Sequence, residues 1–343
     1  MRFGRDTRLE LLRLLGAFAT VWLHVCADAV MLVDLDSTRW WLINYSEAAS
    51  RWGGSAIFLM IGGAILLQRD STTEPVRFVG ERLRRLLPAL VFWSVFYLVW
   101  RAWRTGLPPW PEVAVEIARG VPYYHLWFLY MLVGMMLVVP GLRGVVVARS
   151  GIAWYLLAVC AVVTVIDSAV AVWLGINHAS FLGMFPVFIV YFLGGHLCYQ
   201  RNWRIHPGWL LTAMLLLPFV IANVLGGLYP LVGERAFAFA YSNRGPLVML
   251  LAFSVFIAGL MLLPRDAERW RWYRRHAAPV AHAGLGIYMV HPFWITTLAD
   301  WGYSVHRWQS VWAVALLICA VYALSVLSVL AIARLPGGRK VVL

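Results

Sequence analysis

Residues 9–33 read LELLRLLGAFATVWLHVCADAVMLV, an apolar run in which Glu10, Arg13, His24 and Asp28 are the only acidic, basic or imidazole side chains. A helix needs roughly 20 mostly apolar residues to cross the hydrocarbon core of a bilayer. Because lipid offers the backbone no hydrogen-bonding partners, a spanning segment must satisfy its own backbone, as a helix does. The run therefore predicts a membrane-spanning helix that carries ionisable groups at membrane depth.

Nine further apolar runs follow this one along the chain. They cover residues 52–68, 86–104, 123–142, 152–174, 181–199, 208–228, 243–263, 281–301 and 311–333. The composition agrees, since 62% of the 343 residues are hydrophobic and only 13% are charged, about half the charge of a typical soluble domain. We expect an all-α polytopic integral membrane protein, with about ten transmembrane helices in a single domain over residues 1–343.

The basic residues indicate how the chain is oriented. The formal net charge is +13, and Arg accounts for nearly all of the 29 basic residues. With the N-terminus inside, most of them fall in inside segments, including dense groups at residues 77–85 and 265–275, as the positive-inside rule requires. We therefore expect cytoplasmic N- and C-termini and a place in the bacterial cytoplasmic (inner) membrane. Short basic loops suit membrane lipid headgroups, and we expect no nucleic-acid partner.

The first run also has a feature of a secretory signal peptide. A short apolar stretch follows basic residues, and Ala27-Asp28-Ala29 has the small-residue spacing of a cleavage site. Arg13 interrupts the start of the apolar core, which argues against cleavage. We therefore interpret the run as a membrane span.

The ionisable residues of the first span predict a functional face. Arg13 and His24 are eleven residues apart, which is three helical turns plus about 20°, so they share one face about 16 Å apart. Asp28 follows one turn beyond His24, and a carboxylate there can orient the imidazole and raise its basicity. Such a pair suits a general base that accepts a proton from a hydroxyl. The plainer interpretation is a structural histidine with Asp28 in an interfacial loop, and the residues alone leave both open.

A second group of candidates is basic. Arg82 and Arg85 are three residues apart and share a helix face, with Arg84 beside them. Guanidinium groups bind phosphates well because their planar fork bonds two oxygens at once. The alternative, which the sequence alone favours, is that these residues only set the topology. The remaining polar candidates are Arg51, Glu47, His125 and His291. No metal-binding motif is present, and we expect no metal.

These segments together resemble the acyltransferase family 3 membrane proteins over nearly the whole chain. The resemblance rests on Arg13 and His24 with the preceding Glu10, on the stretch from Arg51 to Leu67, on the RxxR and RLLP around Arg82 to Pro88, and on YHLWFLY (124–130), FLGG (192–195) and GIYMVHP (286–292). No single segment is specific, but their order is. The branch that looks most similar contains O-acetyltransferases of enterobacterial common antigen and succinyltransferases of poly-N-acetylglucosamine. Ala56 and Gly62 stand where the family often has Pro and Ser, so any role of that hydroxyl is absent here.

The resemblance implies an acyltransferase that moves an acyl group, usually acetyl, from cytoplasmic acyl-CoA to a hydroxyl of a cell-surface polysaccharide or its lipid-linked precursor. It implies that His24 is the catalytic base, oriented by Asp28 or another carboxylate. Arg13 would bind or steer the donor, and Arg82, Arg84 and Arg85 would hold its phosphates. Arg51, Glu47, His125, Trp127 and His291 are the candidates for substrate contacts or for the oxyanion donor, and the choice among them stays open.

Both the chemical route and the function have alternatives. Direct transfer and an acyl-His24 intermediate are both compatible with the resemblance. A glycan or lipid transporter or flippase would predict inverted repeats or broken helices, and the sequence shows no internal repeat. A non-catalytic partner of glycan-synthesis machinery is the third alternative. The acceptor glycan and the oligomeric state are not readable from the residues.

Overall fold

The structure is a computed structural model that describes residues 6–30, 37–68, 74–148, 150–175, 184–226, 229–266, 270–304 and 310–342. Every regular element within these ranges is helical. The elements are α1 (Thr7–Val30), α2 (Thr38–Ser50), α3 (Ser55–Leu66), α4 (Pro75–Thr105), α5 (Trp110–Arg119), α6 (Trp127–Ala148), α7 (Ser150–Leu174), η2 (Phe185–Phe188), α8 (Ile189–Gln200), α9 (Pro207–Gly226), α10 (Tyr229–Ala240), α11 (Pro246–Leu262), η3 (Tyr273–Ala277), α12 (Ala278–His282), α13 (Gly284–Asp300), α14 (Val311–Ile332) and α15 (Arg339–Val342).

Local sequence signals set the ends of several helices. The backbone N–H of Arg8 donates to Asp6 Oδ1 at 3.0 Å, and that of Trp40 donates to Ser37 Oγ at 3.0 Å. Short acceptors of this kind satisfy the free N–H groups of a first turn. At its other end α5 stops at Gly120, which adopts the left-handed conformation (φ 76°) that glycine enters without steric cost.

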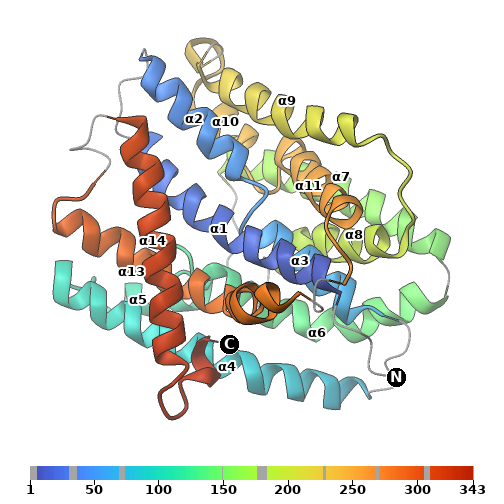
Figure 1. The fold of residues 1–343 in the computed structure, drawn as a ribbon, viewed down its shortest axis with the longest axis horizontal. Helices are drawn as coiled ribbons and strands as arrows, with labels where there is room; N and C mark the ends of the chain where they lie inside the picture. Colours follow the sequence, from blue (N-terminus) through green and yellow to red (C-terminus); the bar gives the residue numbers. More distant parts are fainter. Residues whose placement is uncertain are drawn as a thin grey trace.

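The first helix forms the centre of the bundle. In the view of Figure 1, α1 runs through the middle, with α9 near the top and α4 near the bottom. It packs against α2, α3, α11, α12, α13 and α14. Ala17, Ala19 and Val21 are fully buried, so α1 faces other helices rather than lipid over much of its length. Of the ionisable residues described on this helix, Arg8 and Glu10 are buried, and Arg13 and His24 are partly buried.

The tightest helix pair in the bundle is α3 against α8. A Cβ atom added to Gly63 would collide with the backbone carbonyl of Phe192, and one added to Gly195 would collide with the backbone of Met60. Glycine is common where membrane helices approach this closely. The two segments that carried the resemblance in the sequence, around residues 58–63 and 192–195, therefore pack directly on each other.

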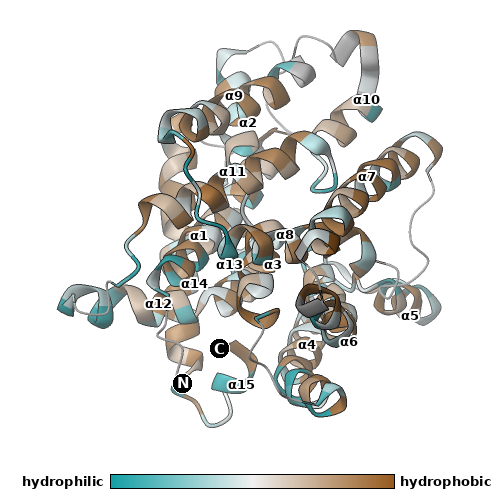
Figure 2. Ribbon diagram, turned by 90° about the vertical axis from the view of Figure 1, so that its right-hand side faces the viewer, coloured by the Kyte–Doolittle hydropathy of each residue, from teal (hydrophilic) through white to brown (hydrophobic). Residues whose placement is uncertain are grey.

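Many apolar side chains of the outer helices are exposed. Figure 2 shows hydrophobic residues along much of α7 and α9. Val162, Ile166, Leu211 and Leu215 are each at least half exposed on these helices. Exposed apolar side chains in this number are what helices in contact with lipid require.

Six helices are long and apolar enough to cross a membrane by length and composition, among the described residues. They are Thr7–Ala27, Thr38–Leu66, Pro75–Thr105, Trp127–Val146, Gly151–Leu174 and Val311–Ile332. Shorter apolar helices cover Phe185–Gln200, Pro207–Asn223 and Pro246–Leu262. The multi-pass, all-helical prediction is confirmed at this level, whereas the count of ten spans and the cytoplasmic termini stay predictions.

Among the described residues, α2, α5, α10 and η3 lie in segments that connect the predicted apolar runs, and most of α12 does as well. α2 precedes the predicted second span and joins α3 through a short bend, so that the two together form one long apolar segment, Thr38–Leu66. α5 is too short to span a bilayer.

The ends of three helices meet at one end of the bundle. The backbone N–H of Thr7 donates to the carbonyl of Arg265 at 3.2 Å, which joins the start of α1 to the segment after α11. The hydroxyl of Tyr199, at the end of α8, donates to Asp6 at 2.9 Å. All three ends belong to segments that the positive-inside pattern predicts to be cytoplasmic, so the contacts agree with that orientation.

Candidate active site

Three predicted residues meet in one histidine cluster. The Nε2 atom of His291, on α13, lies 3.0 Å from Nδ1 of His24, on α1. The ring of His125, in the segment just before α6, lies 5.7 Å from the ring of His291. His125 and His291 are fully buried, while His24 is partly exposed. His24 is therefore the member of the cluster that is partly exposed in this structure, with His125 and His291 packed behind it.

Backbone carbonyls define how the hydrogens are placed on two of these rings. Nδ1 of His24 lies 3.0 Å from the carbonyl oxygen of Thr20, and Nδ1 of His291 lies 3.3 Å from that of Ile287. A carbonyl oxygen only accepts, so each Nδ1 carries the hydrogen. With this assignment, the single Nδ1–H of His24 is shared between the Thr20 carbonyl and Nε2 of His291. This arrangement leaves the lone pair of His24 on Nε2, the atom able to take a proton.

Three tyrosines enclose the cluster. The ring of Tyr124 lies 5.5 Å from that of His24, and its side chain is 50% exposed, so it stands at the mouth of the site. The hydroxyl of Tyr288 donates to the carbonyl of His125 at 2.7 Å. The hydroxyl of Tyr97, on α4, donates to the carbonyl of Met289 at 2.6 Å. These bonds hold the segment before α6, α4 and α13 together around the histidines.

Sequence reasoning did not single out these tyrosines. Tyr124 and Tyr288 stand inside the segments YHLWFLY and GIYMVHP, which were quoted only for the resemblance. A tyrosine next to a candidate histidine was the available signal for both. Tyr97 lies in an ordinary apolar run, and nothing in the sequence marks it.

The bend between α2 and α3 packs on α1 one turn before His24. The backbone N–H of Gly54 donates to Thr20 Oγ1 at 2.8 Å, and this hydroxyl donates to the carbonyl of Gly16 at 2.8 Å. Gly54 has φ +64°, a conformation that favours glycine, and a Cβ on Gly53 would collide with Ala19. Thr20, whose carbonyl binds His24, is thereby held by α3.

Glu47 and Arg51 form an ion pair in this bend. One Nη of Arg51 bonds Glu47, and the other donates to the carbonyl of Tyr241 at 2.6 Å. The guanidinium also lies 4.7 Å from the centre of the Tyr241 ring. Glu47 is almost fully buried. Both predicted substrate contacts are thus engaged with protein groups, and they connect the α2–α3 bend to the segment between α10 and α11.

Arg13 lies on the same face of α1 as His24, toward the other end of the helix. A Cβ on Gly284 would lie 3.1 Å from Arg13 Cγ, so the side chain passes against the start of α13. The neighbouring Glu10 accepts a hydrogen bond from the Tyr273 hydroxyl, and Nε2 of His282 lies 3.9 Å from its carboxylate. Arg13 is therefore close to the carboxylate of Glu10, three residues away on the same helix.

The predicted basic group lies on the first half of α4. The guanidinium of Arg82 stands 5.3 Å from the ring of Phe78, and that of Arg143, on α6, stands 4.1 Å from the same ring. Arg143 also donates to the carbonyl of Leu66 at 2.6 Å. Arg84 and Arg85 are exposed beside them. Sequence reasoning missed Arg143, because it lies far along the chain on another helix.

The basic group and the histidine cluster are well separated along α4. Tyr97, whose ring lies 4.8 Å from that of His125, follows Arg82 by fifteen residues, or about 22 Å along the helix axis. The structure therefore does not bring Arg82, Arg84 and Arg85 to His24. An extended molecule would be needed to contact both.

Two predicted residues are placed differently from the others. Asp28 belongs to α1, but its side chain lies outside the described residues, so its orienting role stays a prediction. Trp127, at the start of α6, packs on Phe188 at 5.3 Å and lines a separate cavity of about 480 Å³ with Arg119 and Asn243. Trp127 therefore belongs to a neighbouring cavity rather than to the histidine cluster.

The described part of the chain contains no group of three His, Cys, Asp or Glu side chains that could hold a metal ion. No curated protein and no solved structure matches the chain significantly. A family model described as an acyltransferase domain matches residues 6–333. This range includes α1, the segment just before α6 and α13, which together supply every residue of the histidine cluster. The match covers nearly the whole chain, so the protein belongs to the acyltransferase 3 family and is a membrane acyltransferase.

Proposed function

We propose that the protein is an O-acetyltransferase of the bacterial inner membrane, which transfers an acetyl group from cytoplasmic acetyl-CoA to a hydroxyl of a cell-surface polysaccharide or its lipid-linked precursor. The observation that carries this proposal is the state of His24. Its Nδ1–H is bonded on the protein side, by Thr20 and His291, and its Nε2 lone pair stays available at the partly exposed edge. That is the arrangement a general base needs.

The donor would lie along the interior of the bundle. Arg82, Arg84 and Arg85, joined by Arg143, offer guanidinium groups for its phosphates. Arg13 stands about 16 Å from His24 on the same helix face, where it would steer the extended arm of the donor. The separation of about 22 Å along α4 between the basic group and the histidine cluster suits a donor whose phosphates and thioester are at opposite ends.

The chemical step is a direct transfer. The acceptor oxygen attacks the thioester carbonyl while Nε2 of His24 takes the hydroxyl proton. The new C–O bond forms, the C–S bond breaks, and the CoA thiolate leaves and takes the proton from the His24 imidazolium. Nε2 of His291 accepts from Nδ1–H throughout, so the positive charge on His24 is shared with a hydrogen-bonded neighbour.

His125 is the best candidate for the oxyanion donor. Neither of its ring nitrogens has a hydrogen-bonding partner of good geometry among the described residues, although the side chain is fully buried. A buried polar group without a partner is rare and calls for an explanation. An N–H aimed at the tetrahedral oxyanion supplies one. Both ring nitrogens of His291 are already engaged, by His24 and by Ile287.

The test is acyl-CoA turnover by purified protein in detergent, followed as thiol release with and without a crude glycan acceptor. Wild type should release thiol from acetyl-CoA in an acceptor-dependent way, and His24→Ala should not. His276→Ala removes an exposed histidine outside the cluster and should behave as wild type. Equal turnover by wild type and His24→Ala would overturn the catalytic assignment. Turnover of succinyl-CoA alone would correct the acyl group, and no turnover of either donor would reject the proposal.

A further inference from the structure

The cavity of about 480 Å³ beside Trp127 is formed by segments far apart in the chain. Arg119 ends α5, Trp127 begins α6, Phe188 belongs to η2, and Asn243 precedes α11. Its volume falls in the usual range for pockets that bind small ligands. With the N-terminus inside, these segments lie at or near the predicted outer side. The cavity is therefore on the side where an acceptor glycan would arrive, opposite the basic group on α4.

Hydrogen bonds from neighbouring helices hold two walls of this cavity in place. The hydroxyl of Tyr191, on α8, donates to the backbone carbonyl of Asn243 at 2.5 Å. The hydroxyl of Thr164, on α7, donates to the carbonyl of Val187 in η2 at 2.8 Å. These bonds fix the backbone on both sides of the cavity, so the pocket is formed before a ligand enters, as most small-molecule sites are.

The polar lining leaves one hydrogen-bonding group unsatisfied. Arg244 forms an ion pair with Asp167 on α7, so this guanidinium is already neutralised. The side-chain Oδ1 of Asn243 is buried and has no hydrogen-bonding partner among the described residues. A buried polar atom without a partner is rare and calls for an explanation. A hydroxyl of a ligand in the cavity would supply the missing donor.

The apolar lining includes a partly exposed aromatic ring. The ring of Trp127 packs on that of Phe188 with 5.3 Å between their centres, which supports the indole in one position. The face of an aromatic ring carries negative partial charge, so the C–H groups on one face of a sugar ring can pack on it while the hydroxyls bond at the edge. A hydrocarbon chain would leave the amide of Asn243 unsatisfied. The lining therefore suits a sugar better than a lipid chain.

The cavity and the histidine cluster share one short segment of chain. Trp127 follows His125 by two residues, so their backbones are no more than about 7 Å apart. Tyr124, one residue before His125, contacts the ring of His24 at 5.5 Å. The segment thus turns two side chains toward the cluster and the third toward the cavity. A sugar in the cavity would be a neighbour of the sugar at His24, within the same glycan.

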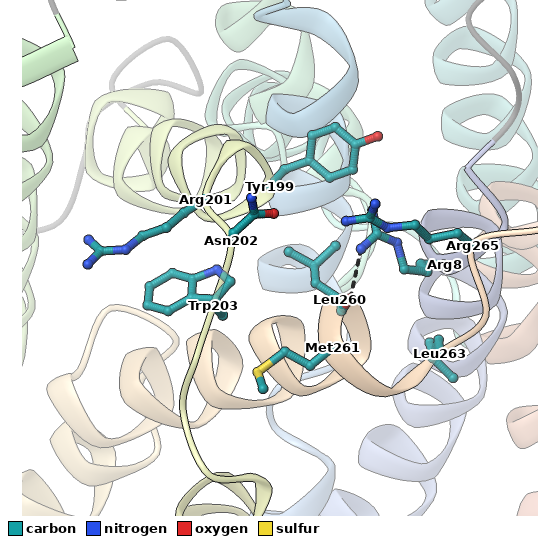
Figure 3. Close-up of a pocket in the computed structure, with 9 residues that line it drawn as sticks. All are labelled: Arg8, Tyr199, Arg201, Asn202, Trp203, Leu260, Met261, Leu263 and Arg265. Carbon is teal, nitrogen blue, oxygen red and sulfur yellow. Dashed lines mark hydrogen bonds between the residues drawn. The ribbon is translucent and has the colours of Figure 1, made fainter.

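The cavity at the predicted cytoplasmic end has different polar groups. It measures about 390 Å³, and Figure 3 shows Arg8 and Arg201 on opposite sides of it. Arg8 binds Asp6 with two nitrogens, at 3.0 and 2.6 Å. Burial raises the pKa of Asp6, but the hydrogen bonds and the charge of Arg8 outweigh it and hold this pKa below its usual value. Its polar groups are therefore paired or directed apart, unlike those beside Trp127.

We propose that the cavity beside Trp127 is a subsite for one sugar residue of the acceptor glycan, next to the sugar whose hydroxyl is acetylated. Trp127 packs on the C–H face of this sugar, and Oδ1 of Asn243 accepts a hydrogen bond from one of its hydroxyls. The subsite selects acceptors by the sugar that adjoins the modified one. This inference rests on the proposed function, because it takes a glycan as the acceptor.

The first test measures glycan binding without turnover. Oligosaccharides released from the crude glycan acceptor are tagged with a fluorophore, and their retention by the full chain, immobilised in a neutral detergent, is titrated. Trp127→Ala should weaken retention about tenfold, the upper end of an aromatic contact, and Asn243→Ala about fivefold, the loss of one hydrogen bond. The control Trp312→Ala removes a tryptophan that is 80% exposed at the start of α14 and should bind as wild type does.

Trp127→Phe separates the aromatic contact from misfolding. It keeps an aromatic face and should retain most of the affinity. A loss as large as that of Trp127→Ala would contradict the stacking contact and reject the subsite. Retention by wild type that is no greater than retention by Trp127→Ala would reject it as well.

Turnover distinguishes this inference from the proposed function. In acceptor-dependent thiol release, Trp127→Ala should raise the KM for the oligosaccharides about tenfold and leave the KM for acetyl-CoA unchanged. Wild-type turnover with an unaltered acceptor KM in Trp127→Ala would overturn the subsite and leave acetyl transfer standing. No turnover by any form would reject acetyl transfer, and retention alone would then decide the cavity. A raised KM for acetyl-CoA with normal glycan retention would assign the cavity to the donor instead.

Discussion

The polar groups at the two ends of α1 differ in how fully they are hydrogen-bonded within the protein. At its start, Asp6, Arg8 and Tyr199 satisfy one another, and Glu10 is bonded by Tyr273. At the other end, His24 uses only Nδ1, and the ring nitrogens of His125 make no hydrogen bond of good geometry within the described residues. Paired groups at the start join helices together. Unpaired nitrogen atoms around His24 leave hydrogen-bonding capacity for a substrate.

This difference separates residues that support the fold from residues that perform the reaction. Removing a group whose partners are all within the protein should mainly reduce stability. Removing a group with a free lone pair or N–H should mainly reduce turnover. Each variant below should therefore change one of these two properties more than the other.

The largest effect is expected for His24→Ala. It removes the proposed base, and positioned general bases contribute about 10²–10⁴ in rate. Acceptor-dependent thiol release should fall by that factor, with little change in the melting temperature because the side chain is partly exposed. A large fall in melting temperature together with normal turnover per folded molecule would place His24 with the supporting residues instead.

His291→Ala should have the next largest effect on turnover, and because this side chain is fully buried with both nitrogens bonded inside the protein, it should lower stability as well. This change removes one of the two acceptors of the His24 Nδ1–H and leaves the Thr20 carbonyl, so the imidazolium formed during transfer loses one hydrogen bond. Hydrogen bonds to charged groups are worth about 1.5–3 kcal/mol, which predicts a fall in kcat of roughly 10–100-fold. His291→Gln offers an amide oxygen as acceptor and should recover part of the rate. Equal rates for the two variants would contradict the tautomer assignment.

The sequence predicted which residues share a face of α1, but it did not predict which residues from other helices meet them. The helical face that carries Arg13 and His24 follows from the repeat of the helix alone, so it was readable. The pairing of His24 with His291 joins residues 267 positions apart, which no local pattern encodes. Sequence reasoning also looked for a carboxylate beside His24 and proposed Asp28. In the described residues the orienting groups are a backbone carbonyl and another histidine, and a backbone carbonyl has no signature in the sequence.

The basic group on α4 was also only partly predictable from the sequence. Arg82 was readable as part of an RxxR, but Arg143 joins it only through the packing of α6 on α4.

Arg143→Gln should raise the KM for acetyl-CoA by about tenfold, because one charge-assisted contact is lost, and it should leave kcat nearly unchanged. Arg119→Gln removes a charge from the separate cavity beside Trp127 and should leave this KM unaltered. A change in kcat alone would contradict the donor assignment.

The smallest effect is expected at the start of α1. Asp6→Asn breaks a partly buried pair with Arg8, so it should lower the free energy of unfolding by about 1 kcal/mol at neutral pH while leaving turnover per folded molecule unchanged. The pKa of Asp6 is lowered in the folded protein, so its contribution is present above the unfolded pKa of about 3.9 and is lost as pH falls through the lower folded value. Melting temperatures of wild type and variant should therefore converge below about pH 4. A constant difference down to lower pH would show that the charge of Asp6 is not what stabilises the start of α1, since Asn can still accept the hydrogen bond from the Arg8 N–H.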